Sequence, residues 1–256
     1  MIRERPLASA TPAALWNALL AELDRDTVRH HAPVWAGRAL VVLPIVGAAV
    51  VAASRVNRGF YGWLTAEDHL IEWGQFFALV GAVIAFAIAA RRAAPASRAL
   101  AVTLGLAALG AFVIAGEEIA WGQRILGFVT PQAIADINHQ DELTVHNIGI
   151  LERVFNVGEA VAGLVGLGLP LARSRGWVPA SLREGGRYDA LVPPLALGVC
   201  FGLAAAYRIV RLPIPAGFTV TRFGELPELT LDIAILGTGI AAAVLLGRRA
   251  ADADRS

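Results

Sequence analysis

The chain has 256 residues, is 56% hydrophobic and only 17% charged, and has a formal net charge of +1. Soluble domains contain about 25% charged residues, so this chain lacks the charge to cover a soluble surface. The apolar content excludes intrinsic disorder, the single Cys200 excludes a disulfide scaffold, and the absence of a separate basic domain argues against nucleic acid as a partner. The composition predicts an integral membrane protein whose main partner is the lipid bilayer.

The N-terminal segment, residues 1–37, is polar and is predicted to be cytoplasmic. We do not expect it to be a signal peptide, because the first long apolar run begins only near Ala39. Within it, Leu15, Trp16, Leu19, Leu20 and Leu23 share one helical face. This pattern predicts a short amphipathic helix on the membrane surface. A soluble helix packed on the loops is the alternative.

Six apolar runs follow, each near the roughly 20 residues that a helix needs to cross the hydrocarbon core. They do not alternate polar and apolar residues as the strands of a membrane β-barrel do. We therefore expect an all-α, polytopic bundle of six transmembrane helices over residues 38–247, followed by a cytoplasmic tail at 248–256. The expected spans are Arg38–Ser54, Leu70–Ala90, Ala99–Leu126, Ile150–Ala172, Ala190–Val210 and Leu229–Gly247.

The arginines predict the orientation of the bundle, because positively charged residues accumulate in cytoplasmic segments. Fifteen of the 22 lie on the side of the two termini and seven on the other side. We expect both termini in the cytoplasm and the protein in the cytoplasmic membrane. Thirteen of the 21 acidic residues lie on the opposite, outer side or in the span portions that lead to it.

Four segments bring polar residues to this outer side, and the first two border the second and third spans. Residues 65–73 open the second span, with Thr65 as the expected N-cap and Asp68 three positions later; Glu72 already lies inside the apolar run. At the end of the third span, Glu117 and Glu118 stand about 27 Å along the helix, where two carboxylates cannot both face lipid cheaply. On a continuing helix, Glu117, Trp121 and Arg124 would share one face, so a Glu117–Arg124 pair is one structural explanation.

The third segment is the outer loop, residues 130–147. Thr130 and Pro131 are expected to be the N-cap and first residue of a short helix. On a continuous helix His139, Glu142 and His146 would occupy one face. Imidazole and carboxylate groups on one face form a ligand set for zinc, iron or manganese. A surface or packing role for the histidines is the alternative.

The fourth segment, residues 223–229, leads into the sixth span. It contributes Glu225 and Glu228, and Glu228 shares a helical face with Asp232 one turn inside the span. Glu159, about nine residues into the fourth span, is expected to reach towards mid-membrane, where an interhelical hydrogen bond is its simplest explanation.

Three of these stretches together resemble a known family. The matching residues are Glu67-Asp68 with Glu72-Trp73, then Gly116-Glu117-Glu118-Ile119-Ala120-Trp121-Gly122-Gln123-Arg124, then Asn138, Gln140, Glu142 and His146-Asn147. They are similar to stretches in a family of bacterial multi-pass membrane proteins without an assigned activity, which has the signature Gly-Glu-Glu-Ile-Ser-Trp-Gly-Gln-Arg and a downstream Asn-x-Gln-x-Glu…His-Asn. The match spans residues 65–150, with weaker similarity at Glu225 and Glu228.

The resemblance implies a shared polar site but names no reaction. Ala120 stands where the family has serine, which argues against a serine nucleophile at this position. His139 occupies a variable position of the family pattern, which favours Glu142 and His146 as the ligands.

Three functions fit this sequence. The first is a metal-dependent hydrolase of a lipid or lipid-linked substrate, facing the outer side and using metal-bound water as nucleophile. The second is a transporter of a cation or metabolite, although transport sites tend to lie near the midplane. The third is a non-catalytic subunit or assembly factor whose polar cluster only holds helix ends together.

The hydrolase hypothesis assigns roles to the polar residues. Glu118 and Glu72 are the catalytic candidates, and a divalent metal such as zinc is the expected cofactor, held by Glu117, Glu142, His146 and His139. The rest of the expected polar site is Asp68, Trp121, Gln123, Arg124, Asn138, Asn147, Glu225 and Glu228.

Overall fold

The computed structural model describes residues 11–66, 69–138, 142–145, 148–212, 217–253 and 255. Over these ranges the predicted all-α fold is confirmed: six helical segments are long and apolar enough to cross a membrane, and no β-strand occurs. The helices are α1 (Pro12–Arg29), α2 (Val34–Ser54), α3 (Arg58–Leu64), α4 (Leu70–Ala93), α5 (Arg98–Glu118), α6 (Gln123–Leu126), α7 (Gln132–Ala135), α8 (Gly149–Ser174), α9 (Gly198–Arg211), α10 (Phe218–Phe223) and α11 (Glu225–Ala253).

Two of the expected spans differ from the structure in instructive ways. The third was expected to run to Leu126, but α5 ends at Glu118, where the backbone turns left-handed. The fifth begins with two 3-10 turns, Asp189–Leu191 and Leu195–Leu197, before the regular helix α9. The pair Pro193-Pro194 between these turns explains the late start, because proline lacks the amide hydrogen that a helix interior requires.

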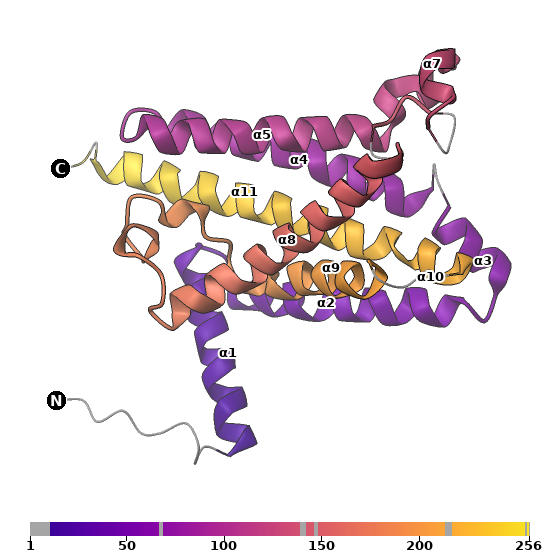
Figure 1. Cartoon of the computed structure of the whole chain (residues 1–256). Helices are drawn as coiled ribbons and strands as arrows, with labels where there is room; N and C mark the ends of the chain where they lie inside the picture. Colours follow the sequence, from indigo (N-terminus) through magenta and orange to yellow (C-terminus); the bar gives the residue numbers. More distant parts are fainter. Residues whose placement is uncertain are drawn as a thin grey trace.

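The long helices run roughly side by side (Figure 1). Helix α4 packs against both α5 and α11, α9 packs against both α8 and α11, and α2 packs against α9. Helix α11 thus joins the α4–α5 pair to the α8–α9 pair. It continues to Ala253, so most of the tail expected at 248–256 is the end of this helix.

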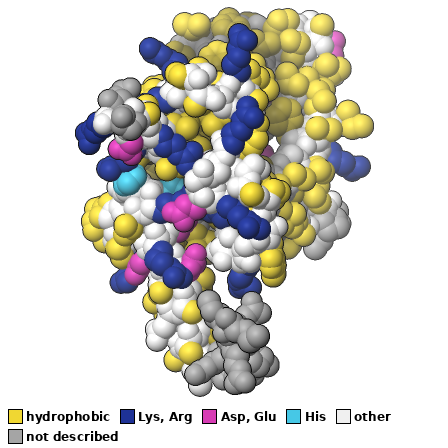
Figure 2. Space-filling model, turned by 90° about the vertical axis from the view of Figure 1, so that its left-hand side faces the viewer, with side chains coloured by type: hydrophobic (Ala, Val, Ile, Leu, Met, Phe, Trp, Pro, Cys, Tyr) yellow, Lys and Arg dark blue, Asp and Glu magenta, His cyan; other side chains and the backbone are white. Residues whose placement is uncertain are grey.

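The bundle has two chemically different ends. At one, called here the acidic end, lie the N-terminal ends of α4, α8 and α11 and the C-terminal ends of α5 and α9. At the other, called here the arginine end, lie α1 and the C-terminal ends of α4, α8 and α11 (Figure 1). Figure 2 views the bundle from the arginine end and shows arginine side chains over much of that face.

Small residues allow the helices to approach closely, as is common in membrane bundles. Buried alanines such as Ala82, Ala108 and Ala242 form much of the core between α4, α5 and α11. A Cβ atom on Gly163 of α8 would lie 2.7 Å from the carbonyl oxygen of Phe201 on α9. Gly163 therefore marks a close contact, and the face of α8 that carries it lies on α9.

Helix α1 is amphipathic, as expected, and lies across the direction of the long helices (Figure 1). Leu15, Trp16 and Leu19 are exposed, whereas Leu23 is buried against the bundle. Its apolar outer face suits an interfacial helix, and its location on a membrane surface stays a prediction.

The last turn of α1 is held by a group of ion pairs that we call the arginine-end network, formed by Asp26, Arg29, Arg173, Asp189 and Arg249. One oxygen of Asp26 accepts a hydrogen bond from Arg173 at 2.6 Å, and the other accepts one from the backbone amide of Leu195 at 2.6 Å. Asp189, which is fully buried, pairs with Arg29 at 3.2 Å and with Arg249 at 2.5 Å. The network fastens α1 to α8, to α11 and to the segment before α9.

His30 adjoins this network at the end of α1. Its Nδ1 lies 2.8 Å from the carbonyl oxygen of Asp26. Burial lowers the pKa of His30 below its ordinary value, against the opposing attraction of Asp26, and the neighbouring Arg29 and Arg173 lower it further. His30 is therefore held in its neutral form.

Candidate functional site

The start of α4 differs from the expected arrangement. Thr65 is not the N-cap of α4 but the C-cap of α3, and its hydroxyl donates to the carbonyl oxygen of Tyr61 at 2.9 Å. His69 takes the N-cap position of α4. Asp68 lies outside the described residues. Because α4 begins only at Leu70, Glu72 falls in its first turn and not deeper in the helix as expected, and its side chain is partly buried.

A left-handed turn ends α5 and explains much of the Gly116–Arg124 signature. Ala120, Trp121 and Gly122 have φ angles of 45°, 54° and 84°, a region that costs non-glycine residues about 1–2 kcal/mol each. The turn folds the indole of Trp121 back onto Gly116, where a Cβ atom would lie 2.8 Å from the ring. The indole Nε1 also donates to Glu117 at 2.7 Å. This part of the signature is a folding unit.

The same unit anchors the following loop. The second carboxylate oxygen of Glu117 accepts a hydrogen bond from the backbone amide of Val145 at 2.5 Å. Gln123 accepts one from the amide of Leu143 at 2.7 Å and donates to the hydroxyl of Thr130 at 2.6 Å. Glu117 and Gln123 therefore hold the loop against the end of α5.

Glu117, Trp121 and Arg124 do not share one face of a continuous helix, as was expected, because α5 ends at Glu118. The Glu117–Arg124 pair itself stays a prediction. The side chain of Arg124 lies outside the described residues. Asn138, expected in the polar site, is buried and donates to the carbonyl oxygen of Thr144 at 2.7 Å, a hydrogen bond within the loop.

The continuous helix expected through the outer loop is absent. Helix α7 ends at Ala135, residues 142–145 are not helical, and Asn138 pairs with Ile148 in an isolated antiparallel bridge. Thr130 does not cap α7, since Pro131 takes the N-cap position. The loop instead closes back on itself through Asn138.

The metal ligands expected on one face of this helix therefore have no continuous helix to align them. Glu142 is described and partly buried. His139, His146 and Asn147 lie outside the described residues. No group of three or more histidine, cysteine, aspartate or glutamate residues suited to a metal ion occurs in the described part of the chain.

Carboxylates from three helices converge inside the acidic end. Glu118, the last residue of α5, interacts electrostatically with Glu72 of α4 and with Glu225, Glu228 and Asp232 of α11. The convergence follows from topology, because α5 runs antiparallel to α4 and α11 and its C-terminal end meets their first turns. Within the described structure neither Glu118 nor Asp232 has a hydrogen bond or an ion pair.

The other side of this cluster is neutralised by an arginine. Arg208 of α9 forms ion pairs with Glu159 of α8 and with Glu228 of α11. Asp232 also interacts electrostatically with Glu159 and Glu228. The expected interhelical bond of Glu159 is thus confirmed as an ion pair, and Glu228 belongs both to the arginine pair and to the carboxylate group.

Two members of this site were not foreseen. Arg208 lies near the end of an apolar run, where its position inside a span already signals a charged partner. Gln75 lies one turn beyond Glu72 and is fully buried. Its Nε2 makes long contacts with a carboxylate oxygen of Glu228 at 3.5 Å and with the carbonyl oxygen of Glu225 at 3.4 Å.

The amide oxygen of Gln75 has no hydrogen-bond partner within the described residues. This atom, Oε1, is buried. A buried, unpartnered amide oxygen is costly and readily receives a cation or a hydrogen-bond donor. We call Glu118, Asp232, Glu228 and Gln75 the acidic-end site.

The acidic-end site offers oxygen ligands from α4, α5 and α11 together with the nearby positive charge of Arg208. Carboxylate and amide oxygens bind protons and hard cations. The class of protein defined so far is a polytopic helical membrane protein with a carboxylate site inside the bundle. Comparison of the chain with family models, with curated proteins and with solved structures gives no match.

Proposed function

We propose that the protein is a membrane transporter that binds a monovalent cation, H⁺ or Na⁺, between Glu118 and Asp232. The observation that carries this proposal is the convergence of these two carboxylates, from α5 and α11, without a hydrogen bond or an ion pair in the described structure. An ionised carboxylate inside the hydrocarbon layer needs a counter-charge. A bound cation supplies it, and the buried oxygen of Gln75 offers a further ligand.

Glu228 connects this site to Arg208. It interacts electrostatically with both Glu118 and Asp232 and forms an ion pair with Arg208. A cation bound beside Glu228 competes with Arg208 for its negative charge. Binding therefore loosens the tie between α9 and α11, the contact through which the α8–α9 pair meets the α4–α5–α11 group. Such rocking of one helix group against another is a common basis of alternating access.

The test is cation uptake into proteoliposomes. Purified protein is reconstituted, and a valinomycin-induced potassium diffusion potential, negative inside, drives uptake. Entry of Na⁺ is followed with the radioactive isotope and entry of H⁺ with an internal pH dye. Glu118→Gln and Asp232→Asn are compared with Glu152→Gln, whose carboxyl is exposed in the first turn of α8.

We expect wild-type and Glu152→Gln vesicles to take up one of the two cations faster than protein-free vesicles, and both site variants to lose the uptake. Wild-type vesicles that take up neither cation, or site variants that match the wild type, would contradict the proposal.

A second candidate is the metal-dependent hydrolase of a lipid or lipid-linked substrate. The observation in its favour is the fixed loop: the amide of Val145 is bound by Glu117, directly before the last helical residue Glu118. In this function a divalent metal such as zinc takes Glu142 and the loop histidines His139 and His146 as ligands. Elemental analysis by mass spectrometry tests it, because protein without stoichiometric metal after reconstitution with zinc excludes this version.

We further propose that the arginine end faces the cytoplasm and that the protein lies in the cytoplasmic membrane. Fifteen of the 22 arginines support this orientation. Reporter fusions at Ser256 and in the loop after α5 test it. A reporter active only in the cytoplasm is expected to work at Ser256 and to fail in the loop, and the opposite pattern would reverse the orientation.

A further inference from the structure

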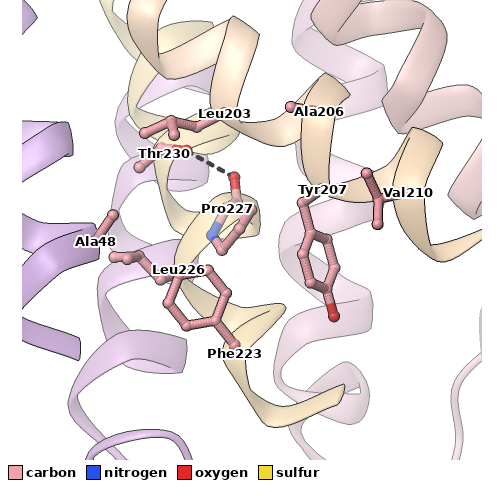
Figure 3. A pocket seen from close by; sticks show the side chains of 9 residues that line it. All are labelled: Ala48, Leu203, Ala206, Tyr207, Val210, Phe223, Leu226, Pro227 and Thr230. Carbon is pink, nitrogen blue, oxygen red and sulfur yellow. Dashed lines mark hydrogen bonds between the residues drawn. The ribbon is translucent and has the colours of Figure 1, made fainter. Parts of the chain in front are cut away.

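A cavity of about 290 Å³ lies between α2, α9, α10 and α11 (Figure 3). Its wall includes Ala48 of α2, Leu203 and Val210 of α9, Phe223 of α10 and Leu226 of α11. It lies outside the acidic-end site, because none of the residues of that site lines it. The cavity needs an explanation of its own, because well-packed interiors leave few voids larger than a water molecule.

Both hydroxyl groups in the wall of this cavity already donate a hydrogen bond to the backbone. The hydroxyl of Thr230 donates to the carbonyl oxygen of Pro227 at 2.8 Å, and that of Tyr207 donates to the carbonyl oxygen of Val220 at 2.9 Å. Figure 3 shows the rings and alkyl groups of the wall turned towards the central space. The cavity therefore suits a hydrocarbon group and not a polar head group.

The mouth of the cavity lies where its wall reaches the exposed surface of α9. Ala206 and Val210, one turn apart on α9, are exposed at its rim, whereas Leu226 and Thr230 are buried at its floor. All four belong to segments long and apolar enough to cross a membrane. The surroundings of the mouth are therefore the hydrocarbon chains of the bilayer.

Tyr207 connects the cavity to the charged side of α9. The guanidinium carbon of Arg208 lies 5.6 Å from the centroid of the Tyr207 ring, a distance that suits a cation–π interaction. Arg208 in turn pairs with Glu159 and Glu228. A group that fills the cavity touches the ring that supports this arginine.

We propose that the cavity binds one acyl chain of a bilayer phospholipid, which enters past the exposed rim residues Ala206 and Val210 and packs on Tyr207 and Leu226. Contacts with the wall hold the chain, since dispersion forces are weak singly and large in sum. The proposal does not depend on cation transport, because the acyl chain takes no part in the carboxylate chemistry.

The experiment uses the full chain in phospholipid nanodiscs that contain a phospholipid with a photoreactive diazirine in its acyl chain. After irradiation, peptide mass spectrometry locates the labelled residues. We expect labelling to concentrate on the peptides that carry Val210, Phe223 and Leu226, above the level on the exposed outer face of α5 around Leu106.

Ala206→Trp fills the mouth and is expected to abolish the labelling at the cavity. The matched control is Ala162→Trp, a change at an exposed alanine on α8, which is expected to leave the labelling intact. If Ala206→Trp protein elutes as an aggregate, Val210→Trp closes the mouth from its other side. Labelling spread evenly over all exposed apolar faces, or unchanged by both closing variants, would overturn the proposal. A photoreactive free fatty acid that labels these peptides while the phospholipid does not would overturn the assignment to a bilayer phospholipid.

Discussion

Both ends of the bundle contain buried carboxylates, but only one end gives each of them a positive partner. At the arginine end, Asp26 is paired with Arg173, and Asp189 with Arg29 and Arg249. At the acidic end, Arg208 is shared by Glu159 and Glu228, while Glu118 and Asp232 have no ion pair within the described structure.

This difference indicates that buried carboxylates have different roles at the two ends. A paired network such as the one at the arginine end fixes elements relative to one another, and it locks α1 to the bundle. A carboxylate pair without partners is unfavourable by itself, and it becomes useful when an exchangeable cation occupies it. The same substitution, aspartate to asparagine, is therefore expected to act in opposite ways at the two ends.

The largest expected effect is at the arginine end. Asp26→Asn leaves the buried Arg173 without its closest counter-charge, and breaking a buried pair in this way typically costs about 3–5 kcal/mol. The free energy of unfolding, measured by titration with a denaturing detergent, is the readout. Asp24→Asn on the same helix is the control, because Asp24 and its partner Arg38 are solvent-accessible; we expect no measurable change there. Equal losses in the two variants would contradict the account of the network.

The next effect concerns the turn that carries the acidic-end loop. Gly116→Ala places a Cβ atom 2.8 Å from the indole of Trp121, so the ring must move, and overpacking of this kind costs about 1–3 kcal/mol. Limited proteolysis is expected to cut the loop around Val145 more rapidly, since the indole no longer holds Glu117. Gly110→Ala in the same helix is the control, since a Cβ atom there meets nothing within 4 Å. If the loop resists proteolysis equally in both variants, the turn does not hold the loop in place.

A smaller effect depends on pH at the arginine end. Burial holds the pKa of His30 below its ordinary value of about 6.5 in the folded state, so the unfolded chain binds more protons around this pH. The contribution of neutral His30 to the free energy of unfolding is therefore fully present above about pH 6.5, and it is lost as the pH falls below this value. His30→Gln is expected to reduce the decline of the unfolding temperature between neutral and mildly acidic pH. An identical decline in wild type and variant would show that His30 does not contribute.

The sequence predicted the spans well and the site only in part, and the reasons are physical. Apolar runs of membrane length fix the helices, and the i, i+4 spacing placed Glu228 and Asp232 on one face. The end of α5 was misjudged because Ala120 and Trp121 adopt left-handed backbone conformations that no residue type there signals. With the helix extended through this turn, the hydrogen bonds of Glu117 with Trp121 and Val145 were not foreseen.

The contacts across helices were the harder part. Arg208 was counted as a flanking charge, since its partner Glu159 lies 49 positions away in the sequence. Gln75 was overlooked because a neutral amide hardly disturbs an apolar run. The convergence of Glu118 with Asp232 depends on the antiparallel packing of α5 beside α4 and α11, which local periodicity cannot supply.

The central claim is that Glu118 and Asp232 form a cation site and do not hold the fold together. The most direct test measures the unfolding free energy and cation uptake of Glu118→Gln and Asp232→Asn together, beside Asp26→Asn. We expect the two site variants to retain or gain stability, since each removes like-charge repulsion, and to lose uptake of H⁺ or Na⁺. Site variants that lose as much stability as Asp26→Asn while uptake by the folded fraction stays at the wild-type level would contradict the claim.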